Sequence, residues 1–166
     1  MNVVYLLLGS NLDDRSALLE KARQEISSKI GRITRQSSVY ESEPWGFHAD
    51  KAFLNQVIRI ESELDPSRIL RQILAIETML GRTRNLGQRY SSRLIDIDIL
   101  FYNDEIIEND HLVIPHKGIP DRMFTLIPLS ELDGSLIHPG SHKTITELIH
   151  DCKDQGAVHL YHSTSS

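Results

Sequence analysis

Six side chains suited to phosphate and metal chemistry stand close together between residues 81 and 102 (GRTRNLGQRYSSRLIDIDILFY). They are four arginines with no acid between them, then two aspartates: Arg82, Arg84, Arg89, Arg93, Asp96 and Asp98. Because residues i and i+2 of a strand lie on one face, both carboxylates are expected on one face and the neighbouring isoleucines on the other. Guanidinium groups bind phosphate bidentately, and carboxylates suit Mg²⁺. The stretch therefore predicts a site for Mg²⁺ and a polyphosphate, although a solvated acidic face and a solvated basic loop would show the same pattern.

Three aromatic residues and an asparagine could hold a flat heterocycle. Aromatic faces can sandwich a planar ring, and an asparagine amide offers both a donor and an acceptor. The residues are Trp45, Phe53, Asn55 and Phe124. Packing in the hydrophobic core is the alternative for each phenylalanine.

The sequence argues against several other kinds of site and partner. It has no GxxxxGK[ST], GxGxxG, HExxH or GxSxG motif, and its eight histidines are not spaced for zinc. The net charge of −5 argues against a general nucleic-acid binder. Cys152 is the single cysteine, and no stretch resembles a signal peptide or a membrane span. We expect a cytoplasmic protein with no nucleic-acid or membrane partner, and a monomer rather than an oligomer.

Hydrophobic periodicity and turn residues predict the elements that must position these groups. In chain order they are a strand at 3–8 ending in a turn at Gly9-Ser10-Asn11, a helix ending at Gly31, a segment at 33–40 that is strand-like at its ends, a loop at 41–51, a strand at 53–64, a helix from Asp65-Pro66 to Gly81, and a strand at 95–102. This βαββαβ order predicts an α+β, ferredoxin-like core, in which helices pack on an antiparallel sheet. We expect one domain over residues 1–166.

Two further features follow from the same patterns. Glu77 falls on the apolar face of its helix, where a carboxylate must either be hydrogen-bonded or face the site. The chain from Asn103 forms a C-terminal extension. It is expected to be extended at 105–114, helical or turn-rich at 121–132 with a break at Pro128, and helical at 144–151.

Six segments of the chain together resemble the 6-hydroxymethyl-7,8-dihydropterin pyrophosphokinases of folate biosynthesis. They are LLLGSNLDDR, SSVYESEPWG, FLNQVIRIES, IETMLGRTR, RYSSRLIDIDILFY and IPHKGIPDRMFTLIPLSEL, and they cover nearly the whole length. Their order and spacing make the match specific. The resemblance implies transfer of the pyrophosphoryl group of ATP to the hydroxymethyl group of the dihydropterin, with release of AMP.

The resemblance also implies which residues act on ATP, the co-substrate. Asp96 and Asp98 would hold two Mg²⁺ ions that bridge the ATP phosphates. Arg82 and Arg93 would contact the phosphates and assist the transfer. Arg84 and Arg122 would be auxiliary contacts to the phosphates or to the loop, and His116 would also contact ATP.

On the pterin side, the resemblance implies a ring stacked between Phe53 and Phe124, with Asn55 hydrogen-bonded to its edge. The rest of that pocket would be lined by Ser42, Pro44 and Trp45. The chain departs from the family at residues 90–92, where Tyr-Ser-Ser replaces the more common Trp-Gly-Pro. Because proline stiffens a backbone, this change would alter the closure of that loop.

Ferredoxin-like domains also serve as non-catalytic ligand sensors or RNA-binding modules. An RNA-binding module would carry the pattern K/R-G-F/Y-G/A-F on a basic sheet, and this acidic chain lacks it. A sensor would not need paired aspartates beside an arginine-rich loop. The residues therefore favour the enzyme.

Overall fold

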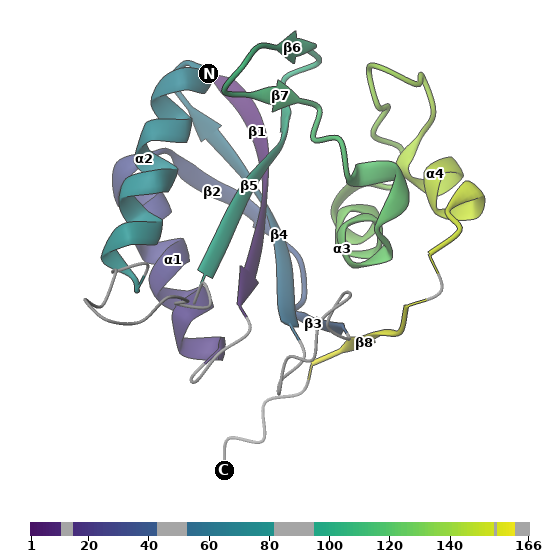
Figure 1. Cartoon of the computed structure of the whole chain (residues 1–166), viewed down its shortest axis with the longest axis horizontal. Helices are drawn as coiled ribbons and strands as arrows, with labels where there is room; N and C mark the ends of the chain where they lie inside the picture. The colour runs from purple at the N-terminus through teal and green to yellow at the C-terminus, as the bar shows by residue number, and fades with distance from the viewer. Residues whose placement is uncertain (11–14, 43–52, 82–94, 155, 162–166) are drawn as a thin grey trace.

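The computed structural model describes residues 1–10, 15–42, 53–81, 95–154 and 156–161. Figure 1 shows the course of the chain. Its elements are β1 (Asn2–Ser10), α1 (Arg15–Lys29), β2 (Arg32–Gln36), β3 (Tyr40–Ser42), β4 (Phe53–Ser62), α2 (Pro66–Met79), β5 (Ile95–Tyr102), β6 (Ile107–Glu108), β7 (Val113–Ile114), the 3-10 turn η1 (Ile119–Asp121), α3 (Met123–Asp133), α4 (Ile145–Asp151) and β8 (Val158–Leu160).

A six-stranded sheet forms the centre of the fold. Its strands follow the order β5-β1-β4-β3-β8, and β2 also pairs with β4. All of these pairings are antiparallel. With β2 and β3 acting as one interrupted strand, the first six elements follow the βαββαβ order, and the predicted ferredoxin-like arrangement is confirmed.

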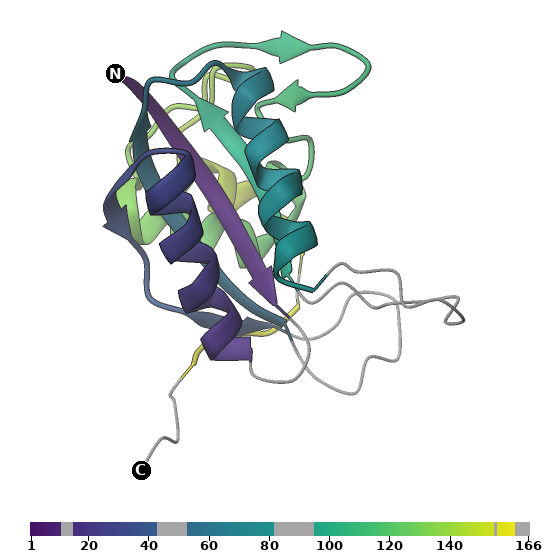
Figure 2. The same ribbon diagram turned by 90° about the vertical axis from the view of Figure 1, so that its left-hand side faces the viewer.

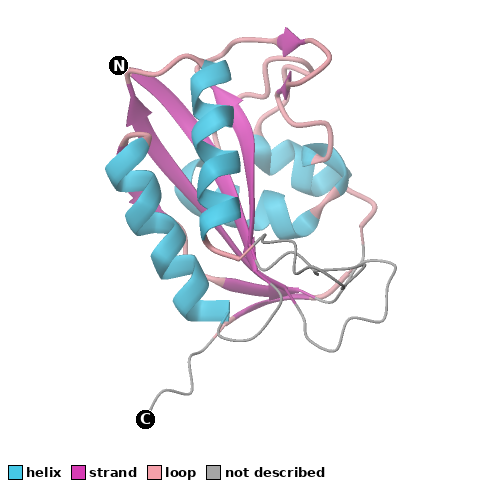
Figure 3. Ribbon diagram, turned by 60° about the vertical axis from the view of Figure 1, so that its left-hand side comes forward, coloured by secondary structure: helices cyan, strands magenta, loops and turns pink. Residues whose placement is uncertain are grey.

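Helices cover both faces of this sheet. On one face α1 and α2 lie side by side over the strands (Figures 2 and 3). That face buries Val4, Leu6 and Leu8 of β1 in the same cluster as residues of both helices. On the other face α3 packs against the sheet and α4 packs on α3 (Figure 1), and residues of both helices share a second apolar cluster with Tyr5 and Leu7. Successive β1 residues thus alternate between the two cores, as the two-residue period of a strand requires.

The predictions for β4, α2 and β5 are confirmed. Asp65 caps α2 by accepting the backbone N–H of Arg68, Pro66 is its first residue, and the helix ends just before Gly81, which has a φ of 140°. A φ in that region favours glycine, since it has no Cβ. The predicted short helix is α4, which begins after a capping box formed by Thr144 and Glu147. None of the helices in the described residues is long and apolar enough to cross a membrane.

The segment at 33–40 is strand-like at its two ends, as predicted, and is interrupted between them. The backbone leaves the strand after Gln36 and rejoins the sheet at Tyr40. Ser37 bonds to β4 through both its backbone and its side chain. Its N–H donates to the Val57 carbonyl, and its Oγ accepts the Val57 N–H. A serine that bonds through its side chain competes with the regular ladder, which explains the interruption.

Three details differ from prediction. Gly9 and Ser10 do not form a turn, because β1 continues to Ser10 with partners on both sides. Pro128 does not break its helix, since α3 runs through it and buries the proline. A proline there lacks the N–H that would bond residue 124, so tertiary packing outweighs the lost bond. The segment expected to be extended at 105–114 is a small hairpin of β6 and β7.

Candidate active site

Three adjacent strands bring an amide and a carboxylate to either side of a glycine. Gly9 of β1 lies opposite Asn55 of β4 on one side and opposite Asp96 of β5 on the other. Neighbouring strands are about 4.8 Å apart, so the backbones of Asn55 and Asp96 are about 10 Å apart. A Cβ at Gly9 would lie 3.3 Å from Asn55 Oδ1. The missing side chain therefore leaves an open floor between the amide and the acid.

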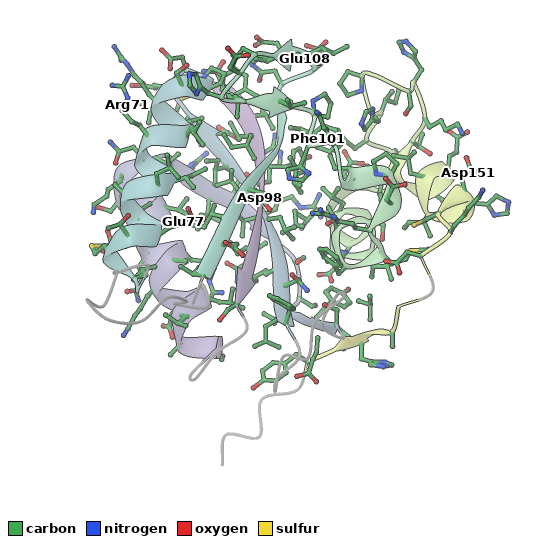
Figure 4. The ribbon with its side chains drawn as sticks, viewed as in Figure 1. Arg71, Glu77, Asp98, Phe101, Glu108 and Asp151 are labelled. Atoms are coloured by element: carbon green, nitrogen blue, oxygen red, sulfur yellow. The ribbon has the colours of Figure 1, made fainter. Side chains whose placement is uncertain are left out.

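Asp96 and Asp98 occupy the same face of β5, as predicted. Burial alternates along the strand, with Ile95, Ile97 and Ile99 packed in the core beneath α1 and α2. Both aspartates line a pocket of about 570 Å³ on the opposite face. Figure 4 shows Asp98 on the side of β5 that faces α3.

The pocket has two walls with different origins. The first, which we call the strand wall, consists of residues on β1, β3, β4 and β5: Leu7, Gly9, Ser42, Phe53, Asn55, Asp96 and Asp98. The second, the C-terminal wall, comes from the segment between β7 and α3 and from the start of α3: His116, Lys117, Gly118, Asp121, Arg122 and Phe124. The two phenylalanines thus reach one pocket from opposite walls.

Within the strand wall, Asn55 is held by a neighbouring strand. Its Nδ2 group lies 2.8 Å from the Ser42 hydroxyl, and both residues are buried. A buried amide that is held at one end keeps a fixed orientation. This contact suits Asn55 to hydrogen-bond the edge of a planar ring.

In the C-terminal wall, the imidazole of His116 lies close to the acid pair. Its Nδ1 accepts the backbone N–H of Gly118 at 2.9 Å, and its Nε2 lies 4.0 Å from Asp98 Oδ1. Because Nδ1 accepts a hydrogen bond, the neutral ring carries its proton on Nε2, facing the pocket. Burial lowers the pKa of His116, and the charge of Arg122 acts in the same direction against the opposing effect of Asp98.

Arg122 is packed against the same wall. Its guanidinium carbon lies 5.7 Å from the centre of the Phe124 ring, within the range of a cation–π contact. A Cβ at Gly118 would come within 2.7 Å of that guanidinium group. Gly118 therefore makes room for Arg122 and places a cation beside an aromatic ring.

Eight predicted site residues meet in this pocket: Ser42, Phe53, Asn55, Asp96, Asp98, His116, Arg122 and Phe124. The other five predicted residues lie outside the described residues, as does the unusual Tyr-Ser-Ser at 90–92: Pro44, Trp45, Arg82, Arg84 and Arg93. The sequence alone did not identify Leu7, Gly9, Lys117, Gly118 or Asp121 as pocket residues. Gly9 had been assigned to a turn, and only the strand register reveals that it forms the floor.

The carboxylates fit the ligand preference of Mg²⁺. No group of three or more His, Cys, Asp or Glu side chains within the described residues is arranged to hold a metal by itself. Magnesium usually takes one or two carboxylates and completes its shell with water and substrate phosphate oxygens. Asp96 and Asp98, two carboxylates open to a pocket large enough for substrate, match that donor set.

Comparison with known proteins shows which family the chain resembles. The family model described as 7,8-dihydro-6-hydroxymethylpterin-pyrophosphokinase (HPPK) matches residues 5–134. A 2-amino-4-hydroxy-6-hydroxymethyldihydropteridine pyrophosphokinase of Porphyromonas gingivalis is 43% identical over 141 residues, which cover 84% of this chain and 95% of that protein. The enzyme of the same name from Methylorubrum extorquens is 37% identical over 150 residues, covering 90% of this chain and 92% of its own.

Solved structures support the fold. A Plasmodium falciparum HPPK-DHPS triple mutant matches 90% of this chain with a TM-score of 0.72 at 20% identity. This chain spans only 44% of that longer protein. The family predicted from the six segments is confirmed, and this chain belongs to the 7,8-dihydro-6-hydroxymethylpterin-pyrophosphokinase family.

Proposed function

We propose that the pocket between the strand wall and the C-terminal wall is the place where this pyrophosphokinase of folate biosynthesis joins ATP to hydroxymethyldihydropterin. One observation carries the proposal: the acid pair, the buried amide of Asn55 and the two phenylalanines open into a single pocket. A phosphate-transfer centre and a ring-binding slot thus lie next to each other, which a two-substrate transfer requires.

The acid pair is the proposed metal site. Asp96 and Asp98 would hold two Mg²⁺ ions together with oxygens of the ATP phosphates. When bound, Mg²⁺ supplies neutralisation of the charge that develops on the transferred group. The backbone that carries both aspartates pairs with β1, so it is held in place before substrate arrives.

The dihydropterin would occupy the slot between Phe53 and Phe124, with Asn55 bonded to its edge. Stacking between two phenylalanine rings fixes the plane of the pterin ring, and the hydrogen bond at one edge fixes its rotation within that plane. The hydroxymethyl group can then point toward the acid pair. Ser42, Pro44 and Trp45 are proposed as further lining of this slot.

Cationic and hydrogen-bond-donating side chains complete the phosphate site. From the C-terminal wall, Arg122 presents its guanidinium group and His116 the Nε2–H of a neutral ring to the same pocket. The family resemblance adds Arg82 and Arg93 as the residues that assist transfer, with Arg84 as a further phosphate contact. Catalysis of phosphoryl transfer consists mainly of such positioning and charge stabilisation.

The reaction follows from these positions. The hydroxymethyl oxygen bonds to the β-phosphorus of ATP, and the bond between that phosphorus and the oxygen bridging to the α-phosphate breaks. AMP leaves with the bridging oxygen, and the hydroxyl proton passes to solvent. In a loose transition state the nucleophile bonds only weakly, so early proton removal is not required. We further propose that residues 1–166 act as one domain, as a cytoplasmic monomer.

Measurement of AMP tests the proposal. The wild-type chain should release AMP from ATP only when both Mg²⁺ and hydroxymethyldihydropterin are present. Asp96→Ala should lower kcat by at least about a hundredfold, the scale of losing one charge-stabilising group. Asp104→Ala is the matched control, because Asp104 is an exposed aspartate just beyond β5, and it should leave the rate unchanged. An Asp96→Ala variant with full activity would rule out the metal assignment, and a wild type that releases no AMP would rule out the reaction.

A further inference from the structure

Glu77 is a buried carboxylate directly behind the acid pair. It lies near the end of α2 and is only 5% exposed. Its Oε2 accepts the backbone N–H of Ile97 at 2.8 Å. Ile97 stands between Asp96 and Asp98 in the sequence. Figure 4 shows Glu77 on the α2 side of β5 and Asp98 on the opposite side.

The strand that carries the acid pair has only one strand neighbour in the described part of the sheet. β5 pairs with β1, and on its other side the backbone N–H of Ile97 reaches Glu77 of α2. A strand at the edge of a sheet lacks the second ladder that fixes a central strand. The hydrogen bond from the Ile97 N–H to Glu77 supplies a contact on that outer edge. It lies at the residue between the two aspartates.

If position 77 had only to fill space in the core, a carboxylate there would lower the stability of the fold. Removing an ionised group from water carries a large penalty, and apolar residues of similar volume often stabilise a fold equally well or better. A carboxylate does, however, make a shorter and stronger bond to a backbone N–H than a neutral acceptor does. That strength is useful where a backbone must be held in one position.

We propose that Glu77 is a positioning residue that fixes the backbone at Ile97 and thereby sets the spacing and direction of Asp96 and Asp98. The inference rests on the proposed role of these two aspartates as metal ligands. Magnesium demands nearly ideal octahedral geometry, so small shifts of its ligands weaken its binding. Groups that orient metal ligands typically change metal affinity about 10–100-fold when they are removed.

Three substitutions at residue 77 separate the bond from the charge and from the volume. Glu77→Gln keeps an acceptor of the same length. Glu77→Met keeps the volume and removes the acceptor. Glu77→Asp keeps the charge but withdraws it by one methylene from Ile97. Ile76→Val is the matched control, because it truncates a fully buried neighbour on α2 without removing the bond to Ile97.

The first measurement is the Mg²⁺ concentration that gives half-maximal AMP production at saturating substrates. Glu77→Met and Glu77→Asp should raise it about tenfold, and Glu77→Gln should raise it less, about threefold, because its neutral amide is a weaker acceptor. Ile76→Val should lower the melting temperature but leave the Mg²⁺ dependence unchanged. The second measurement needs no turnover: calorimetric binding of Mn²⁺ with a non-hydrolysable ATP analogue should weaken in the same order. Hydrogen exchange at the Ile97 amide should accelerate with it.

The outcomes separate this proposal from the proposed function. If the wild type makes AMP and Glu77→Met or Glu77→Asp keeps its Mg²⁺ dependence, the positioning role is wrong while the enzyme assignment stands. A shift in Ile76→Val as large as that in Glu77→Met would also overturn it, because general weakening of α2 would then explain the effect. If the wild type makes no AMP, the function fails, and Mn²⁺ binding with Ile97 exchange still decides the role of Glu77.

Discussion

The strand wall and the C-terminal wall of the pocket carry different charges and are held by different contacts. Asp96 and Asp98 stand on a strand whose backbone pairs with β1 along its length. The basic residues His116, Lys117 and Arg122 stand instead on the irregular stretches before and after the short 3-10 turn η1. The segment between β7 and α3 is anchored at two described points, where the His116 N–H bonds the Leu100 carbonyl and where Ile119 is fully buried.

This difference matches what each wall must do. Metal ligands must stand in nearly fixed positions, and a hydrogen-bonded ladder holds residues in fixed positions. Cationic groups on phosphate act through charge, which falls off slowly with distance, so their supporting segment can be less regular. The pocket therefore places its geometrically demanding residues on the sheet and its charge-balancing residues on the extension.

The two phenylalanines offer the largest expected effects in a comparison of the walls. Loss of one stacking partner for a planar base typically costs about 1–3 kcal/mol, so Phe53→Ala or Phe124→Ala should raise the KM for the dihydropterin about 10–100-fold. Only Phe124→Ala should also lower kcat, because Arg122 packs on that ring. Steady-state kinetics with each substrate varied would measure both effects.

A truncation outside the pocket controls for general damage. Ile106→Ala removes an exposed apolar side chain that does not line the pocket, and it should change neither constant. If Phe53→Ala and Phe124→Ala have identical effects on kcat, the coupling of Arg122 to the ring is not part of catalysis. If neither changes the KM for the dihydropterin, the ring-binding slot is elsewhere.

A second prediction concerns the hydrogen bonds that join α3 to the start of β3, outside the pocket. Glu131 of α3 accepts the Tyr40 hydroxyl at 2.6 Å and the Ser38 backbone N–H at 2.8 Å. Burial, together with the hydrogen bond and charge of Glu131, raises the pKa of Tyr40 to about 12. Glu131→Ala should lower the free energy of unfolding by about 2 kcal/mol, and Tyr40→Phe by about 1 kcal/mol, since it removes one bond.

Denaturant unfolding would measure these losses, with Asp110→Ala as an exposed acidic control. In Glu131→Ala the pKa of Tyr40 should fall toward its ordinary value of 10.0, because two of the three causes that raise it are removed. NMR titration with labelled tyrosine would follow it. An unchanged stability in both variants would show that apolar packing alone holds α3 to the sheet.

Local patterns in the sequence were sufficient for the regular parts of the fold. Strict alternation predicted β4 and the shared face of Asp96 and Asp98, and Asp65-Pro66 with Gly81 bounded α2. The interruption at Ser37 could not be predicted this way, since it depends on Val57, twenty residues away, and its neighbour Ser38 bonds to Glu131. Non-local contacts also explain why Gly9 remains in a strand.

Less of the site was accessible from patterns alone. The pair of aspartates was predicted from strand periodicity, but His116 and Arg122 were assigned only through the family resemblance. Their placement depends on how the extension folds back onto the sheet, and no sequence period encodes that. Gly118 shows the same limit, because its role is to leave space for Arg122.

The smallest expected effect tests how the C-terminal wall is anchored. The residue before α3, Arg122, makes no side-chain capping bond, and the Met123 N–H instead bonds Oδ2 of Asp154 at 3.0 Å. Asp154→Ala should therefore cost about 1 kcal/mol of stability, as loss of a helix cap does, whereas Asp154→Asn should retain most of it. Because Phe124 is the second residue of α3, fraying there should also raise the KM for the dihydropterin severalfold in Asp154→Ala. Thermal melts and steady-state kinetics would measure the two effects.

If the stability of Asp154→Ala falls but its KM for the dihydropterin does not change, the cap supports the helix without holding Phe124. The position of that ring then depends on the burial of Ile119 and on the packing of α3 against the sheet.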